Sequence, residues 1–218
     1  KVLPRFTVHS TLSYPSLMLS MAQLWQRYST LRRAALAQGF LSIAFSAFWS
    51  TLAVMLSEHY HMGSAIAGAF GIAGAAGALA APMAGHLADK VGAAKVTQLG
   101  ALLVTVSFAL MFLLPALPVQ GQWLLIALSA VGFDLGLQSS LVAHQNLVYS
   151  LEPLARGRLN ALLFTMVFIG MALGSVLGSQ VYALANWEGV VALATFSSAI
   201  ALVIRLTGNP SLSKTSVA

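Results

Sequence analysis

Charged side chains are scarce in this sequence. Only 7% of its 218 residues are Asp, Glu, Lys or Arg, while 58% are hydrophobic. Soluble domains carry about 25% charged residues, so a soluble globule of this size could not cover its surface with so few. In lipid, a helix satisfies its own backbone hydrogen bonds. The composition therefore excludes an ordinary soluble domain and predicts an all-α membrane protein.

Cysteine is absent, which excludes disulfide bonds and thiolate metal sites. The His59–His61 pair has no third ligand in view, so we expect neither a metal nor a cofactor. An intramembrane aspartyl protease would need two membrane aspartates, and only Asp134 is present. Ser175 and His144 lack a nucleophile-elbow sequence around the serine. The alternative of an intramembrane enzyme thus lacks the residues it needs.

Six long apolar segments follow one another along the chain, and a spanning helix needs about 20 such residues. None alternates between apolar and polar residues as a barrel strand does. The sequence predicts a six-helix transmembrane bundle over 34–206, with spans at 34–56, 64–84, 96–114, 123–148, 159–185 and 187–205.

Every lysine and arginine falls on one side of this arrangement. Five of the eleven precede the first span, and the others lie in the second–third and fourth–fifth loops, at the last residue of the sixth span and after it. The remaining loops, SEHYHMG, PALPVQGQ and NWEG, hold none. Because cytoplasmic loops are enriched in Lys and Arg, we expect both termini in the cytoplasm (N-in/C-in). The net charge of +6 then reflects topology and does not indicate nucleic-acid binding.

Two flanking regions complete the predicted organisation. Residues 1–33 are expected to form a cytoplasmic linker with a short amphipathic helix, since apolar residues from Leu17 to Tyr28 repeat at helical spacing. Residues 207–218 are expected to form a cytoplasmic tail. A linker at the start of the chain suggests that another segment would precede it.

One carboxylate interrupts the fourth apolar segment. Asp134 lies about 16 Å along the helix from Trp123, near the bilayer midplane. A charge there costs at least about 2.5–3.5 kcal/mol, so a carboxylate at this place indicates a function. We predict that Asp134, Gln138 and His144 contact protons or substrate in a central cavity. A protonated Asp134 bonded to a neighbouring helix, and an interface position for His144, are the structural alternatives.

The loop between the second and third spans reads GHLADKVGAAK, from Gly85 to Lys95. Glycines permit a tight turn between neighbouring helices. Asp89 is placed to accept hydrogen bonds at the start of the third span, where the helix dipole favours a negative charge. It is also placed to pair with Arg156 or Arg158 of the neighbouring cytoplasmic loop, which would lock one conformation.

This loop resembles the signature G-x-L-x-D-R/K-x-G-R/K of the major facilitator superfamily. Five positions match the signature: Gly85, Leu87, Asp89, Lys90 and Gly92. Ala93 departs from it, because the family usually has a basic residue there. The later P-x-x-R-G-R stretch, from Pro153 to Arg158, resembles a cytoplasmic loop in the C-terminal half of bacterial drug and metabolite exporters of this family.

The resemblance implies one six-helix half-bundle of a twelve-helix secondary-active transporter. Its implied activity is proton-coupled efflux of a small molecule by alternating access in the bacterial inner membrane, an antiporter mechanism. The implied partners are the small-molecule substrate, protons, the lipid bilayer and a missing N-terminal half or a second copy of the chain. A truncated, non-functional transporter fragment is the alternative.

Glycines recur at helical spacing in two spans. Gly68, Gly71, Gly74 and Gly77 lie in the second span, and Gly170, Gly174 and Gly178 lie in the fifth. Small residues let membrane helices approach closely. Packing within the bundle is one interpretation, and contact with another bundle is the other. In a chain that stands alone, we expect both glycine faces to be exposed.

Overall fold

The structure, a computed structural model, describes residues 13–75 and 80–207. These residues form helices without any strand, which confirms the prediction of an all-α fold. The helices are α1 (Tyr14–Arg27), α2 (Ser29–Tyr60), α3 (Ser64–Ala75), α4 (Ala80–Val91), α5 (Ala93–Leu110), α6 (Val119–Tyr149) and α7 (Arg156–Leu206), with short 3-10 helices η2 (Met111–Ala116) and η3 (Pro153–Ala155).

Within the described residues, four segments are long and apolar enough to cross a membrane. They are Ser29–Tyr60, Ala93–Ala116, Val119–Tyr149 and Pro153–Leu206. The predicted span 64–84 covers α3 and the first part of α4. Between them, residues 76–79, which include Gly77, lie outside the described ranges. The count of six spans therefore stays a prediction.

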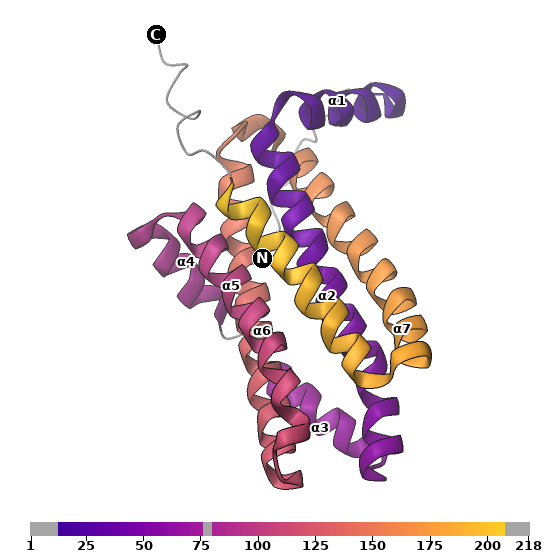
Figure 1. The fold of residues 1–218 in the computed structure, drawn as a ribbon. Helices are drawn as coiled ribbons and strands as arrows, with labels where there is room; N and C mark the ends of the chain where they lie inside the picture. The colour runs from indigo at the N-terminus through magenta and orange to yellow at the C-terminus, as the bar shows by residue number, and fades with distance from the viewer. Residues whose placement is uncertain (1–12, 76–79, 208–218) are drawn as a thin grey trace, which may run out of the picture.

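Helix α7 is too long to be one straight span. Its 51 residues would extend about 75 Å, more than twice the roughly 30 Å of a hydrocarbon core. The backbone leaves helical geometry at Ala185 and Asn186. Beyond this kink the chain turns back, so that the last part of α7 lies in front of α2 in the view of Figure 1. The reversal places Trp187 and Glu188 at a turn near one end of the bundle.

Aromatic side chains fill the centre of the bundle. Phe48, Phe108 and Phe133 are fully buried and come from α2, α5 and α6. Phe108 and Phe133 stack with their ring centroids 4.6 Å apart. Phe45 and Trp49 meet Phe133 edge-on from the side of α2. Offset and edge-to-face contacts are the favourable arrangements for such rings, so this cluster ties three helices together.

Three glycines of α7, at positions 170, 174 and 178, pack inside the bundle. A Cβ atom added at Gly170 would collide with the backbone of Gly39, and one at Gly174 with the backbone of Ile43. Gly178 meets Ala47 in the same way. The expectation that this face is exposed is therefore wrong, because the three glycines let α7 approach the backbone of α2. Added Cβ atoms at Gly68 and Gly71 of α3 would meet nothing within 4 Å.

Helix α1 lies across one end of the bundle (Figure 1). Leu24 is buried there beside Leu159 and the start of α2. The Tyr28 hydroxyl donates a hydrogen bond to Glu152 Oε2 at 3.1 Å. Burial raises the pKa of the Tyr28 hydroxyl, and its bond to Glu152 raises it further. The exposed Leu19 and Tyr14 leave α1 with an apolar side that suits a membrane surface.

Candidate functional site

Asp134 is enclosed within the bundle on α6. Its side chain is only 5% exposed, and its Oδ2 atom is buried without a hydrogen-bond partner among the described residues. Gln138, one helical turn further on, is half-buried. A buried carboxylate normally needs a donor or a cation beside it. The structural alternative, a hydrogen bond to a neighbouring helix, is not made by Oδ2.

His144 occupies an interface between α6 and α2. Its ring is completely buried, and Nδ1 lies 2.8 Å from Gln38 Oε1. An amide oxygen accepts hydrogen bonds, so this contact places the donated proton on Nδ1. The Nε2 atom is also buried and has no partner within the described part of the chain. In this conformation His144 contacts a neighbouring helix, as its structural alternative proposed.

Asp134 and His144 belong to different parts of α6. Ten residues separate them, which corresponds to about 15 Å along the helix. The structure brings neither into direct contact with the other. Each therefore needs its own explanation, and the predicted set of three cavity residues divides into Asp134 with Gln138 and His144 with Gln38.

The sequence did not predict that Gln38 and Arg205 are buried. Gln38 was detectable as a polar residue within an otherwise apolar span. Arg205 counted as a loop charge, yet it is 8% exposed and its Nε donates to Thr97 Oγ1 at 2.9 Å. Gln98 donates to the Arg205 carbonyl at 3.2 Å. These bonds connect the end of α7 to the start of α5, near the end of the bundle that carries α1.

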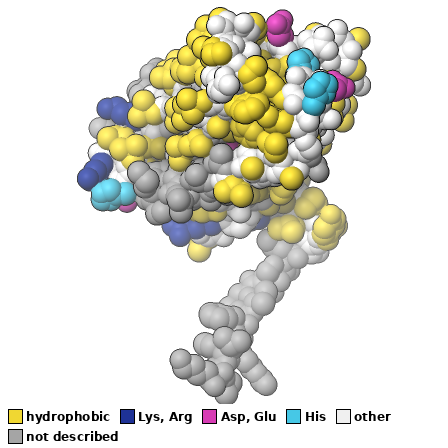
Figure 2. Space-filling model, turned by 90° about the horizontal axis from the view of Figure 1, so that it is seen from below, with side chains coloured by type: hydrophobic (Ala, Val, Ile, Leu, Met, Phe, Trp, Pro, Cys, Tyr) yellow, Lys and Arg dark blue, Asp and Glu magenta, His cyan; other side chains and the backbone are white. Residues whose placement is uncertain are grey.

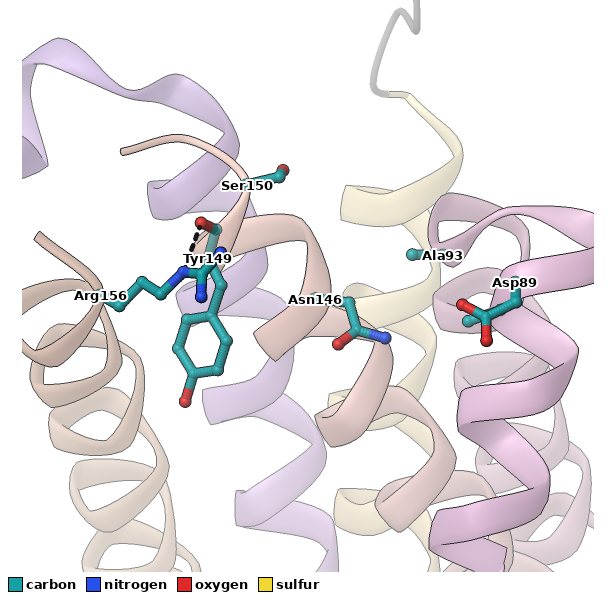
Figure 3. A pocket seen from close by; sticks show the side chains of 7 residues that line it. Asp89, Ala93, Asn146, Tyr149, Ser150 and Arg156 are labelled. Atoms are coloured by element: carbon teal, nitrogen blue, oxygen red, sulfur yellow. Dashed lines mark hydrogen bonds between the residues drawn. The ribbon is translucent and has the colours of Figure 1, made fainter. Parts of the chain in front are cut away.

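The GHLADKVGAAK loop and Arg156 meet at a pocket of about 420 Å³ at the same end of the bundle. In Figure 3, Asp89 of α4 and Arg156 of α7 lie on opposite sides, and Asn146 of α6 lies between them. Other lining residues are Ala88, Ala93, Tyr149 and Ser150. The Arg156 Nε donates to the Tyr149 carbonyl at 3.4 Å. The structure thus brings Asp89 and Arg156 to one pocket, with the guanidinium bonded to α6.

Helix α5 contains the start of the third predicted span, and the residue at its N-cap is Gly92 and not Asp89. Gly92 is the N-cap of α5 with φ of 92°, and no side chain caps this helix. Only glycine adopts such a φ without strain, which explains the motif glycine at this position. Asp89 and Lys90 lie in the last turn of α4. The prediction that Asp89 caps the following helix is therefore wrong.

The remaining predicted residues do not form a further cluster. Gly85 lies in α4, and Arg158 lies in the first turn of α7. The described residues hold no group of three or more His, Cys, Asp or Glu side chains placed to bind a metal ion.

Comparisons with known proteins find one matching family and several related sequences. The model of the Major Facilitator Superfamily matches residues 34–217. A probable transporter of Streptomyces coelicolor is 34% identical over 181 residues, which cover 81% of this chain and 40% of that protein. An uncharacterized transporter of Escherichia coli is 32% identical over 192 residues, covering 86% of this chain and 47% of the relative. The chain spans less than half the length of these relatives.

Proposed function

The chain belongs to the major facilitator superfamily, and we propose that it forms one six-helix half of a secondary-active transporter. The proposed activity is efflux of a small molecule across a bacterial inner membrane in exchange for protons. Membership in this family indicates transport rather than enzymatic activity. The other half would come from the same longer chain, from a second chain or from a second copy.

The burial of Asp134 is the observation that supports the proton-coupled part of this proposal. An enclosed carboxyl whose Oδ2 has no partner is stable with its proton attached, because an unpaired buried charge is costly. Opening the bundle to water on one side would hydrate the carboxylate and let the proton leave. A transporter that alternates between two such states can couple proton movement to substrate movement.

The proposed topology places both termini, the α4–α5 turn and the start of α7 in the cytoplasm. It rests on the one-sided distribution of lysine and arginine. Cysteines introduced at Ser57, Gln120 and Asn186 should react with an impermeant thiol reagent in intact cells. A cysteine at Ala93 should react only after the membrane is opened. Labelling of Ala93 in intact cells would contradict this topology.

Proton-coupled flux tests the proposed function itself. The chain would be fused behind the N-terminal half of its Streptomyces coelicolor relative and reconstituted in liposomes that contain a pH-sensitive dye. We expect candidate small molecules from a panel to release protons through the fusion and not through the chain alone. Such flux from the isolated chain as a monomer would contradict the half-transporter proposal. A folded fusion that moves nothing would favour the alternative of a non-functional fragment.

A further inference from the structure

Two arginines lie near each other at the end of the bundle that carries α1. The Nη2 atom of Arg33, near the start of α2, donates hydrogen bonds to the carbonyl of Ile204 and to Thr207 Oγ1. Arg205 follows Ile204 in α7, and it is close enough to Arg33 for the two charges to act on each other. Because an arginine side chain keeps its charge in proteins, two positive charges adjoin at this place.

The described hydrogen-bond acceptors of both arginines are neutral oxygens. All five acidic residues of the chain lie within the described ranges, and none of them is such an acceptor. They lie at the opposite end of the bundle, in the middle of α6, at the Tyr28 hydroxyl and in the pocket of Arg156, and they are Glu58, Glu188, Asp134, Glu152 and Asp89. Burying a charge without a counter-charge is costly, so an anion from outside the chain would stabilise this place.

Arg205 extends from a buried position to the surface. Its side chain is 8% exposed, and its Nε donates to Thr97 Oγ1 at 2.9 Å. Among the described residues, no acceptor lies at its two terminal nitrogens, and neither nitrogen is fully enclosed. The same holds for Nη1 of Arg33. Guanidinium groups bind phosphate oxygens through paired hydrogen bonds, so these nitrogens are placed to hold a phosphate.

The surface beside Arg205 is apolar. Val203 and Leu206 flank it on α7, and both are exposed. On α5, Gln98 donates to the Arg205 carbonyl at 3.2 Å, and the neighbouring Leu99 is exposed. Figure 2 shows hydrophobic side chains over much of the surface, with lysine and arginine side chains toward its left and lower margins. A ligand that combines a phosphate with acyl chains fits this combination of charge and apolar surface.

Both arginines lie at the predicted border of the membrane. Arg33 directly precedes the first predicted span, and Arg205 is the last residue of the sixth. Under the proposed topology this border faces the cytoplasm. Basic pockets between transmembrane helices on that side bind acidic lipid headgroups.

We propose that Arg33 and Arg205 together bind the phosphate of one acidic phospholipid. The acyl chains of this lipid would lie along α5 and the last part of α7. A free phosphate ion has the same charge chemistry, but it would gain nothing from the apolar neighbours of Arg205. The site uses none of the residues assigned to proton coupling, and its occupancy does not depend on the proposed transport.

Lipid binding to the whole chain tests this site. The chain would be purified in an uncharged detergent, and bound lipid would be counted by native mass spectrometry. Dioctanoyl phosphatidylglycerol is the acidic probe, and dioctanoyl phosphatidylcholine has the same phosphate and chains but no net charge. We expect one phosphatidylglycerol to bind at least about tenfold more tightly than phosphatidylcholine. Inorganic phosphate at the concentration of the lipid should not displace it.

Substitutions locate the binding at the arginine pair. Arg205→Gln and Arg33→Gln should each reduce the preference for phosphatidylglycerol about fivefold, and the double variant should remove it. Arg158→Gln is the matched control, because it removes the same charge from another half-buried arginine, in the first turn of α7. It should leave the preference unchanged. Circular dichroism identifies variants that fail to fold, and the half-buried Arg33 keeps the test available if Arg205→Gln is one of them.

Three results would overturn the proposal. Equal affinity of the wild-type chain for the two lipids would exclude a site for acidic phospholipid. Equal losses of preference from Arg33→Gln and Arg158→Gln would assign the attraction to the total charge at this end of the bundle. Displacement of the lipid by inorganic phosphate would identify a site for a soluble anion and not for a lipid.

Discussion

Replacing Gly170 with leucine is expected to abolish close packing between α2 and α7 and to leave little folded protein. A Cβ at this position would overlap the Gly39 backbone, which cannot move aside as a side chain can. Helix association in membranes depends mainly on such close packing. Overpacking of this kind should cost about 3 kcal/mol or more, which corresponds to a fall in Tm of about 6–12 °C for a chain of this size.

Gly71→Leu provides the matched control. Gly71 also lies in an apolar helix, but a Cβ there would meet nothing within 4 Å. Thermal melting followed by size-exclusion chromatography in detergent should show a large loss for Gly170→Leu and little change for Gly71→Leu. Similar losses from both variants would mean that leucine is harmful in these helices irrespective of the α2–α7 contact.

The contrast between these glycines shows what a single sequence could predict. The spacing of Gly170, Gly174 and Gly178 indicated a packing face on one helix. It could not identify the partner, because the contacting residues Gly39 and Ile43 are more than 100 positions away in the chain. Composition and hydropathy are local properties and predicted helices correctly. Pairing of helices depends on three-dimensional complementarity, so the exposed face expected for these glycines was wrong.

The sequence also predicted some of the buried polar residues and not others. Asp134 was detectable because a carboxylate is rare within an apolar segment, and the structure encloses it. Arg205 followed an apolar segment and therefore resembled an ordinary loop charge. Only the arrangement of α5 beside the end of α7 shows that Thr97 accepts its hydrogen bond. Trp187 was likewise expected near the start of a span, but its burial with an unpaired indole N–H depends on the kink before it.

Asp134→Asn is expected to abolish proton-driven transport while leaving the bundle folded. The amide has nearly the same shape as the carboxyl but does not ionise at neutral pH, so the coupling step would be lost. In the liposome assay with the fused N-terminal half, proton release should fall to the level of empty liposomes. Exchange of substrate for substrate, which moves no net proton, should persist for whichever compound in the panel is carried.

Ser129→Ala separates loss of a proton carrier from loss of an unpaired buried polar group. Ser129 lies on the same helix, is 3% exposed and has an Oγ without a hydrogen-bond partner among the described residues. Removing an unpaired buried polar atom should stabilise the fold by about 1 kcal/mol or leave it unchanged. Asp134→Leu should do the same, since a leucine needs no hydrogen bond. If proton release survives Asp134→Asn, or if Ser129→Ala abolishes it equally, Asp134 is a structural residue, and the proton must be carried by another group of the complete transporter.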